Sequence, residues 1–184
     1  DQRAFQGHSG VGEGSFMMSR KRKNSSLPIG AELLQATFSV TNKQKTFHTP
    51  PVEKITEEAM TLMRAQKGAQ AEHLFRRALT FEPLQPDLLY NLGTALTIQD
   101  RESEGITLTE TVHILFPDYL FARTSLATTA MRAGNHERAS ELLVPIFSRR
   151  KFHISEFNSL CATLIEFSLL MEQPYSARIW FETW

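Results

Sequence analysis

The sequence predicts an all-α protein of stacked helix–turn–helix units, an α-solenoid, preceded by a poorly structured N-terminal tail. Two observations lead to this prediction. From Val52 onward, apolar residues recur at helical spacing, and turn signals separate them about every 15 residues. In addition, a shift of the sequence by 34 residues aligns small residues with small residues and Pro83 with Pro117, and a period of this length is typical of helical repeats.

Residues 1–50 are expected to form the tail, a flexible segment or linker that is rich in glycine, serine and basic residues. Residues 1–30 show neither the period of a strand nor that of a helix. They contain a basic run, Arg20–Lys23. The sequence leaves its role open between a solvated tail, a localisation signal and a contact with an anionic partner.

The end of this tail carries weak structural signals. Residues 31–40 fit either a short helix or a strand. Pro50 and Pro51 exclude a helix that continues through them from the N-terminal side, because proline lacks the N–H group and restricts the residue before it. His48 has no histidine or cysteine at metal-ligand spacing, so we interpret it as a turn residue.

Residues 52–184 are expected to form the repeat domain, with units at about 52–85, 86–119, 120–153 and 154–184. The expected helix pairs are 52–65 with 68–82, 86–99 with 102–115, 119–133 with 136–149, and 154–171 with 174–184. Prolines close the first two units, because proline cannot continue a helix. Pro145 interrupts the third unit, where an interior proline costs roughly 3 kcal/mol unless the helix kinks or stops. About four extra residues precede Pro174, so the first helix of the fourth unit is expected to be a turn longer.

Small side chains recur where the helices of such pairs would cross. They stand at Ala59, Gly93, Ala127 and Cys161 for one crossing, and at Ala71, Gly105, Ala139 and Ala177 for the other. Two helix backbones approach closely only where no bulky side chain separates them. A single unit cannot bury its own apolar face, so neighbouring units are expected to stack.

These positions resemble the tetratricopeptide repeat family. The matching residues are Ala71, Phe75, Ala78 and Pro83 in the first unit, Leu92, Gly93, Leu96 and Pro117 in the second, and Leu126, Ala127, Gly134 and Ala139 in the third. The match covers about residues 52–150 clearly and 154–184 more weakly. The resemblance implies a right-handed superhelix of helix–turn–helix repeats.

In this family the first helix of each pair lines a concave groove that contacts the ligand. The resemblance therefore implies a partner-binding site formed by Glu53, Thr56, Met60, Arg64, Tyr90, Asn91, Thr94, Phe121, Thr124, Thr128, Arg132 and Asn158. Such a mixture of aromatic, apolar and hydroxyl side chains suits an extended or helical peptide with apolar anchors. Each position also fits the plainer interpretation of a solvated helix face.

One subclass of the family holds the C-terminal carboxylates of heat-shock chaperones with two lysines, two asparagines and an arginine. In this chain Asn91 fits one of those positions. The others are occupied by Thr56, Met60, Phe121 and Ser125, which carry no positive charge. The resemblance therefore does not extend to chaperone-tail binding.

The expected function is that of an adaptor or scaffold that binds a protein or peptide partner. The alternative is a regulatory or substrate-recruiting array of a larger enzyme whose catalytic part lies outside this chain. The chain itself is not expected to be an enzyme, because the phosphate-loop, dinucleotide, zinc-protease and serine-hydrolase motifs are absent. No cofactor or metal is expected, since no two histidines stand four residues apart. Cys161 is interpreted as a packing residue.

Composition restricts the partner and the compartment. The 20 basic and 20 acidic residues cancel, so nucleic acid is not the expected partner. No apolar run is long enough to span a membrane. A single cysteine and the lack of a visible signal peptide favour the cytoplasm.

The two ends of the sequence suggest a piece of a longer protein. The chain begins at Asp1 instead of a methionine, and it ends inside an apolar stretch. Trp180, Phe181 and Trp184 lie in that stretch, and repeat arrays need a polar capping element. We therefore expect either further chain or a partner to cover these three side chains.

Overall fold

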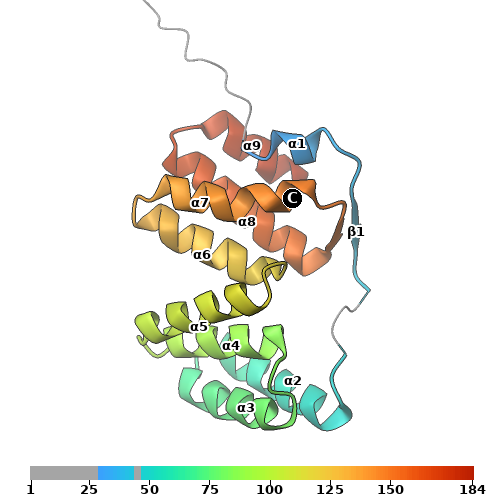
Figure 1. The fold of residues 1–184 in the computed structure, drawn as a ribbon, viewed down its shortest axis with the longest axis vertical. Helices are drawn as coiled ribbons and strands as arrows, with labels where there is room; N and C mark the ends of the chain where they lie inside the picture. Colours follow the sequence, from blue (N-terminus) through green and yellow to red (C-terminus); the bar gives the residue numbers. More distant parts are fainter. Residues whose placement is uncertain (1–28, 44–46) are drawn as a thin grey trace, which may run out of the picture.

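Helices make up most of the residues that the computed structural model describes, which are 29–43 and 47–184 (Figure 1). In chain order the elements are α1 (Ala31–Leu34), β1 (Ser39–Thr41), α2 (Pro50–Arg64), α3 (Gly68–Phe81), α4 (Pro86–Thr97), α5 (Glu102–Leu115), α6 (Leu120–Arg132), α7 (His136–Leu143), the 3₁₀ helix η1 (Val144–Ser148), β2 (Lys151–His153), α8 (Ile154–Leu170) and α9 (Pro174–Thr183). The predicted all-α class is confirmed in its main feature, although β1 and β2 are strands. The basic run Arg20–Lys23 lies outside the described residues.

Proline sets the start of several helices. α2 begins at Pro50, slightly before the predicted start at residue 52, while α4 and α9 begin at Pro86 and Pro174 as predicted. Proline suits a first turn because the N–H group that it lacks would have no helical partner there. α8 has 17 residues and is longer than α2, α4 and α6, which confirms the predicted extension of this helix.

Pro145 ends a helix early. The sequence suggested one helix over 136–149, but α7 stops at Leu143 and the chain continues as η1. The carbonyl of Leu142 lies in the last turn of α7, where carbonyl groups lack a partner within the helix. It accepts a hydrogen bond from Arg123 Nη1 at 3.2 Å, so a side chain of α6 satisfies a group that α7 leaves open.

The same turn follows α2, α4, α6 and α8. In each turn one residue has a positive φ, namely Gln66 (57°), Asp100 (60°), Gly134 (76°) and Glu172 (53°). The next residue donates its N–H to a carbonyl five residues back, as Lys67 does to Leu62 at 2.9 Å. These two features define the Schellman motif of helix C-termini. The sequence pointed to Gly134 alone, because the other three residues are not glycine.

Helices α2 to α6 pack on one another in chain order. α6 also packs on both α7 and α8, and α8 packs on α9. The helices therefore follow one another along the long axis of the molecule (Figure 1). The buried apolar side chains form two clusters, one of α2, α3 and α4 around Phe75, and one of α1 and α6 to α9 around Trp180. Between them, α5 buries Gly105, Thr109 and Val112.

The small residues that the sequence placed at helix crossings are all buried. They are Ala59, Ala71, Gly93, Gly105, Ala127, Ala139, Cys161 and Ala177. A Cβ added at Gly93 would lie 3.1 Å from the carbonyl oxygen of Gly105, and one added at Gly105 would lie 2.7 Å from that of Gly93. The two glycines therefore meet at one crossing, not at the two separate crossings expected from the sequence.

Residues 29–41 pack on the C-terminal helices, so the prediction of a tail over 1–50 is wrong for this part. β1 pairs in parallel with β2, and Val40 lies opposite Phe152. α1 buries Leu33 in the cluster that contains Trp180. The sequence could not reveal this packing, because a helix of 4 residues and a strand of 3 residues are too short to show a hydrophobic period.

Trp180 is fully buried, which corrects the expectation that further chain or a partner would cover it. Its Nε1 donates a hydrogen bond to the carbonyl of Ile29 at 3.0 Å. Gly30 lies so close that an added Cβ would stand 2.9 Å from Cζ2 of Trp180. The N-terminal segment of the same chain is therefore the cover, and Phe181 and Trp184 remain 68 % and 55 % exposed.

Candidate functional site

The residues that the sequence predicted to bind a partner lie on the expected helices α2, α4, α6 and α8. One hollow, which we call the hydroxyl hollow, is lined by the predicted residues Tyr90, Thr94, Thr124, Thr128 and Arg132. A second, which we call the acid hollow, is lined by Glu53, Thr56 and Phe121. The remaining predicted residues, Met60, Arg64, Asn91 and Asn158, line neither hollow. The structure thus brings eight of the twelve predicted residues to two hollows.

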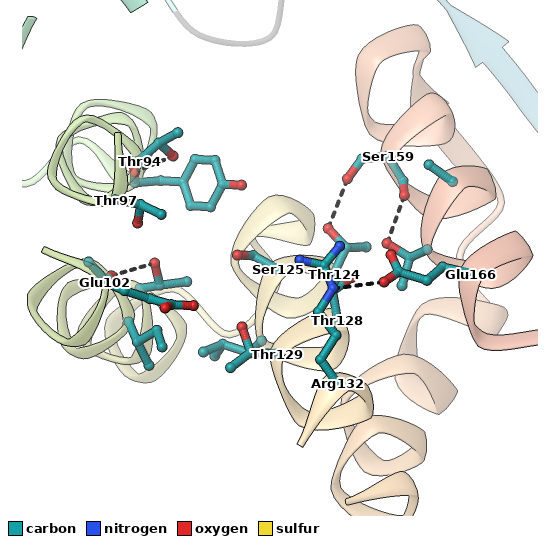
Figure 2. Close-up of a pocket in the computed structure, with 17 residues that line it drawn as sticks. Thr94, Thr97, Glu102, Thr124, Ser125, Thr128, Thr129, Arg132, Ser159 and Glu166 are labelled. Carbon is teal, nitrogen blue, oxygen red and sulfur yellow. Dashed lines mark hydrogen bonds and ion pairs between the residues drawn. The ribbon is translucent and has the colours of Figure 1, made fainter. Parts of the chain in front are cut away.

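Side chains of α4, α5, α6 and α8 line the hydroxyl hollow, with α6 in the middle (Figure 2). Its volume is about 350 Å³, and more than half of the lining side chains are serine or threonine. Several of these hydroxyls already donate within their own helix: Thr94, Thr97 and Thr163 bond the carbonyl one turn back at 2.9–3.2 Å. A hydroxyl that donates in this way can still accept a hydrogen bond through its lone pairs. The hollow therefore suits ligands that carry N–H groups, such as a peptide main chain.

Two contacts join α6 to α8 in this hollow (Figure 2). Thr124 Oγ1 and Ser159 Oγ lie 2.9 Å apart, and Arg132 Nε donates to Glu166 Oε1 at 2.8 Å. The hydrogen bond and the charge of Glu166 raise the pKa of Arg132. Two residues that the sequence predicted to contact a partner therefore also hold α6 against α8.

An aromatic cluster of Tyr90, Tyr119 and Phe121 connects the two hollows. Tyr90 lines the hydroxyl hollow, whereas Tyr119 and Phe121 line the acid hollow. The ring centroids lie 5.5–5.9 Å apart in tilted or edge-on arrangements, as aromatic pairs prefer. Burial raises the pKa of both tyrosines, and hydrogen bonds of Tyr90 with Ser125 and Thr94 offset this only in part. Both phenols are therefore neutral, and the cluster can anchor an apolar side chain.

The acid hollow has a volume of about 470 Å³ and lies at the N-terminal parts of α2, α4, α6 and α8. Its carboxylates are those of Glu53, Glu57, Asp87 and Glu156. Among the described residues, no lysine or arginine lines it. The hollow therefore has a negative electrostatic character.

His48 lines the acid hollow and links two carboxylates. Its Nδ1 lies 2.6 Å from Glu82 Oε2, and its Nε2 lies 2.8 Å from Asp87 Oδ2. A neutral imidazole has one N–H group, so only the protonated ring donates to both oxygens. Burial lowers the pKa of His48, but the hydrogen bonds and charges of Glu82 and Asp87 outweigh it and raise the pKa above its ordinary value. The interpretation of His48 as a turn residue missed this role.

Sequence reasoning also missed Glu57, Asp87 and Tyr119. One signal was present, because Glu53 and Glu57 stand one turn apart and must share a helix face. Asp87 follows Pro86 at the start of a helix, where acidic residues are common because they complement the helix dipole. The pattern therefore could not mark Asp87 as part of a site.

The chain matches none of the known protein-family models and none of the curated proteins with which it was compared. Within residues 29–43 and 47–184, no helix is long and apolar enough to cross a membrane. The same residues contain no group of three or more His, Cys, Asp or Glu side chains that could hold a metal ion. Burial raises the pKa of the Cys161 thiol to about 11, so this cysteine stays protonated near neutral pH.

Proposed function

We propose that this chain is an interaction module of the tetratricopeptide type, an adaptor or scaffold that holds a segment of a partner protein. The segment would lie on the face formed by α2, α4, α6 and α8. The observation that carries the proposal is the aromatic cluster between two hollows on these helices. Aromatic anchors beside polar contacts are typical of sites that bind peptides and proteins.

The spacing of the helix turns supports a repeat architecture. The residues of positive φ after α2, α4 and α6 are 66, 100 and 134, and these numbers differ by the 34 residues of a tetratricopeptide unit. The next one, residue 172, follows the longer helix α8. Successive hairpins of one geometry would stack as a superhelix, and their first helices would share one side.

The chemistry of the two hollows favours an extended or helical peptide segment. The hydroxyl hollow offers acceptors to N–H groups, and the aromatic cluster offers apolar contact area. Binding rather than catalysis is proposed, because the thiol of Cys161 is buried and both nitrogens of His48 face carboxylates. Neither group is free to attack a substrate or to move a proton for one.

The double variant Tyr90→Ala with Phe121→Ala tests the proposed function. It removes two of the three anchor rings, so we expect at least a tenfold loss of recovered partner. The measurement is affinity capture with the intact chain from an extract of the source cells, quantified by mass spectrometry. Circular dichroism checks that helicity is unchanged.

The matched control is Phe81→Ala with Ile114→Ala, which removes two exposed apolar side chains from α3 and α5. A third protein, Thr128→Arg, fills the hydroxyl hollow without removing a packed ring. We expect the control to recover the partner like wild type and Thr128→Arg to lose it. Equal recovery by all of these proteins would place the binding surface elsewhere and overturn the proposal.

A further inference from the structure

The carboxylates of the acid hollow differ in whether they already have partners. Glu156 is bonded by Arg149, whose Nη2 lies 3.2 and 3.3 Å from its two oxygens. Glu53 and Glu57 are exposed, and neither carboxylate has an ion-pair partner in the described part of the chain. Lys54 is next to Glu53 in sequence but does not line the hollow. The charges of Glu53 and Glu57 are therefore available to a ligand.

The charges of Glu53 and Glu57 repel each other. They stand one turn apart on α2, and like charges at this spacing destabilise a helix. A single cation between them would replace this repulsion by two attractions. The position of both residues at the edge of a hollow allows such a cation to come from outside the chain.

Asp87 adds a further carboxylate to the hollow. Its Oδ2 faces His48, but its Oδ1 is buried and has no hydrogen-bond partner among the described residues. The imidazole of His48 also lines the hollow, but its two nitrogens already face Glu82 and Asp87, so it does not balance the charges of Glu53 and Glu57.

The aromatic residues of the hollow complete a site for a cation. Tyr119 and Phe121 line it together with the carboxylates. Burial, followed by the charge of Asp87, raises the pKa of Tyr119, so its ring stays neutral. Cations bind to the faces of aromatic rings, and the aliphatic part of a lysine or arginine side chain packs well on them.

We propose that the acid hollow binds a lysine or arginine side chain, and that the partner segment held on this face is therefore basic. The inference rests on the proposed function and specifies the charge of the partner. The cationic group lies between Glu53 and Glu57 on one side and the rings of Tyr119 and Phe121 on the other. This polarity is opposite to that of a site for acidic peptide tails.

Fluorescence polarisation with three labelled nonapeptide pools tests the inference on the full chain. The pools share the same randomised positions and differ at three fixed positions, which are lysine or arginine, glutamine, or glutamate. We expect the basic pool to bind at least tenfold more tightly than the glutamine pool and the glutamate pool to bind least. Added salt should weaken the basic pool most, because it screens exposed charges.

Glu53→Gln with Glu57→Gln should weaken binding of the basic pool about tenfold and leave the glutamine pool unchanged. The matched control, Glu110→Gln with Glu137→Gln, makes the same charge change on α5 and α7 outside the hollow and should have no effect. Equal binding of the basic and glutamine pools, or an unaffected Glu53 and Glu57 variant, would overturn the inference. A further variant replaces Arg20–Lys23 by glutamine. If this variant binds the basic pool more strongly than wild type, the chain's own basic run competes for the hollow, and this result would also overturn the inference.

The same assay separates failure of this inference from failure of the proposed function. If Tyr90→Ala with Phe121→Ala abolishes binding of every pool while the Glu53 and Glu57 variant binds like wild type, the face binds peptides without a preference for basic ones. The inference then fails alone. If the Tyr90 and Phe121 variant binds every pool like wild type, the proposed function fails with it.

Discussion

At the crossing of α4 and α5, two glycines allow the helix backbones to approach closely. A Cβ at Gly105 would lie 2.5 Å from Thr97 Oγ1 as well as 2.7 Å from the carbonyl oxygen of Gly93. Neither the carbonyl nor the helical threonine can move far, because both belong to a packed helix. A side chain at either position would therefore push the two helices apart.

Replacing Gly93 by leucine should destabilise the protein by about 3 kcal/mol or more, at the upper end of overpacking effects. In a chain of this size that corresponds to a fall of the melting temperature by about 6–12 °C. Thermal unfolding followed by circular dichroism measures it. Ala69→Leu, an exposed position on α3, is the matched control and should change the midpoint little. An unchanged midpoint for Gly93→Leu would show that the two helices do not cross there.

Single residues also show what the sequence could reveal about the crossings. The period of the chain identified Gly93 and Ala127 as equivalent small positions, and both are buried. The period compares one unit with the next, so it cannot show which residues touch within a unit. The contact between Gly93 and Gly105 therefore became visible only in three dimensions.

At the scale of elements, the segment before α2 is attached to the junction of α3 and α4. Glu82, at the C-terminus of α3, accepts hydrogen bonds from Thr49 N and Thr49 Oγ1 at 2.8 and 2.9 Å. His48 joins Glu82 to Asp87 in the first turn of α4. The backbone hydrogen bond from Thr49, followed by that from His48, lowers the pKa of Glu82. The junction therefore combines a carboxylate whose pKa is lowered with a histidine whose pKa is raised.

This junction should make stability depend on pH. Because the folded-state pKa of His48 is raised above the ordinary value of 6.5, its contribution is fully present below pH 6.5 and is lost as pH rises through the raised pKa. We expect the free energy of unfolding of wild type, relative to His48→Gln, to fall between pH 6 and pH 9. Urea unfolding of both proteins across this range measures the difference.

The comparison of wild type with His48→Gln separates the pH dependence that His48 causes from the pH dependence that His113 causes. Burial, and then the charges of Arg123 and Arg138, lowers the pKa of His113. Its protonation therefore destabilises the fold below pH 6.5, equally in wild type and in His48→Gln. A difference between the two proteins that stays constant from pH 6 to pH 9 would contradict the raised pKa of His48.

The helices from α2 to α9 were largely predictable, because prolines, small residues and turn signals mark their ends. The prediction failed where local pattern carries no information. The helix predicted over 136–149 is longer than α7, because the sequence could not show whether Pro145 kinks the helix or stops it. The packing of Ile29 and Gly30 on Trp180 depends on a contact between distant parts of the chain. No periodic pattern records such a contact.

At the scale of the whole molecule, the hydroxyl hollow lies where the two apolar clusters come together. Helix α4 belongs to the first cluster and α6 and α8 to the second, and all three contribute to the hollow. α5 joins the clusters, because its Ile106 packs on the second cluster and its Leu108 on the first. Ligand sites are often found at such junctions, since packing there leaves space that is not filled by the protein.

The lining of the two hollows was predictable in part, for a physical reason. Tyr90 and Phe121 were found because repeat register fixes which side of a helix they occupy. Asp87 and Tyr119 lie at helix starts, where the repeat register does not show in which direction a side chain points. Thr124 was correctly placed on this side, yet it is buried against Ser159, because the neighbouring helix α8 approaches closely at this point.

We propose that a partner segment lies on the first helices of the pairs. Hydrogen exchange read by mass spectrometry can locate such a segment, with the intact chain and a peptide selected on it from a random 12-residue library. We expect the bound peptide to slow exchange in 86–97 and 120–132, and to leave 68–81 and 136–143 unchanged. Slower exchange confined to 68–81 and 136–143, or to 174–184, would contradict this placement of the segment.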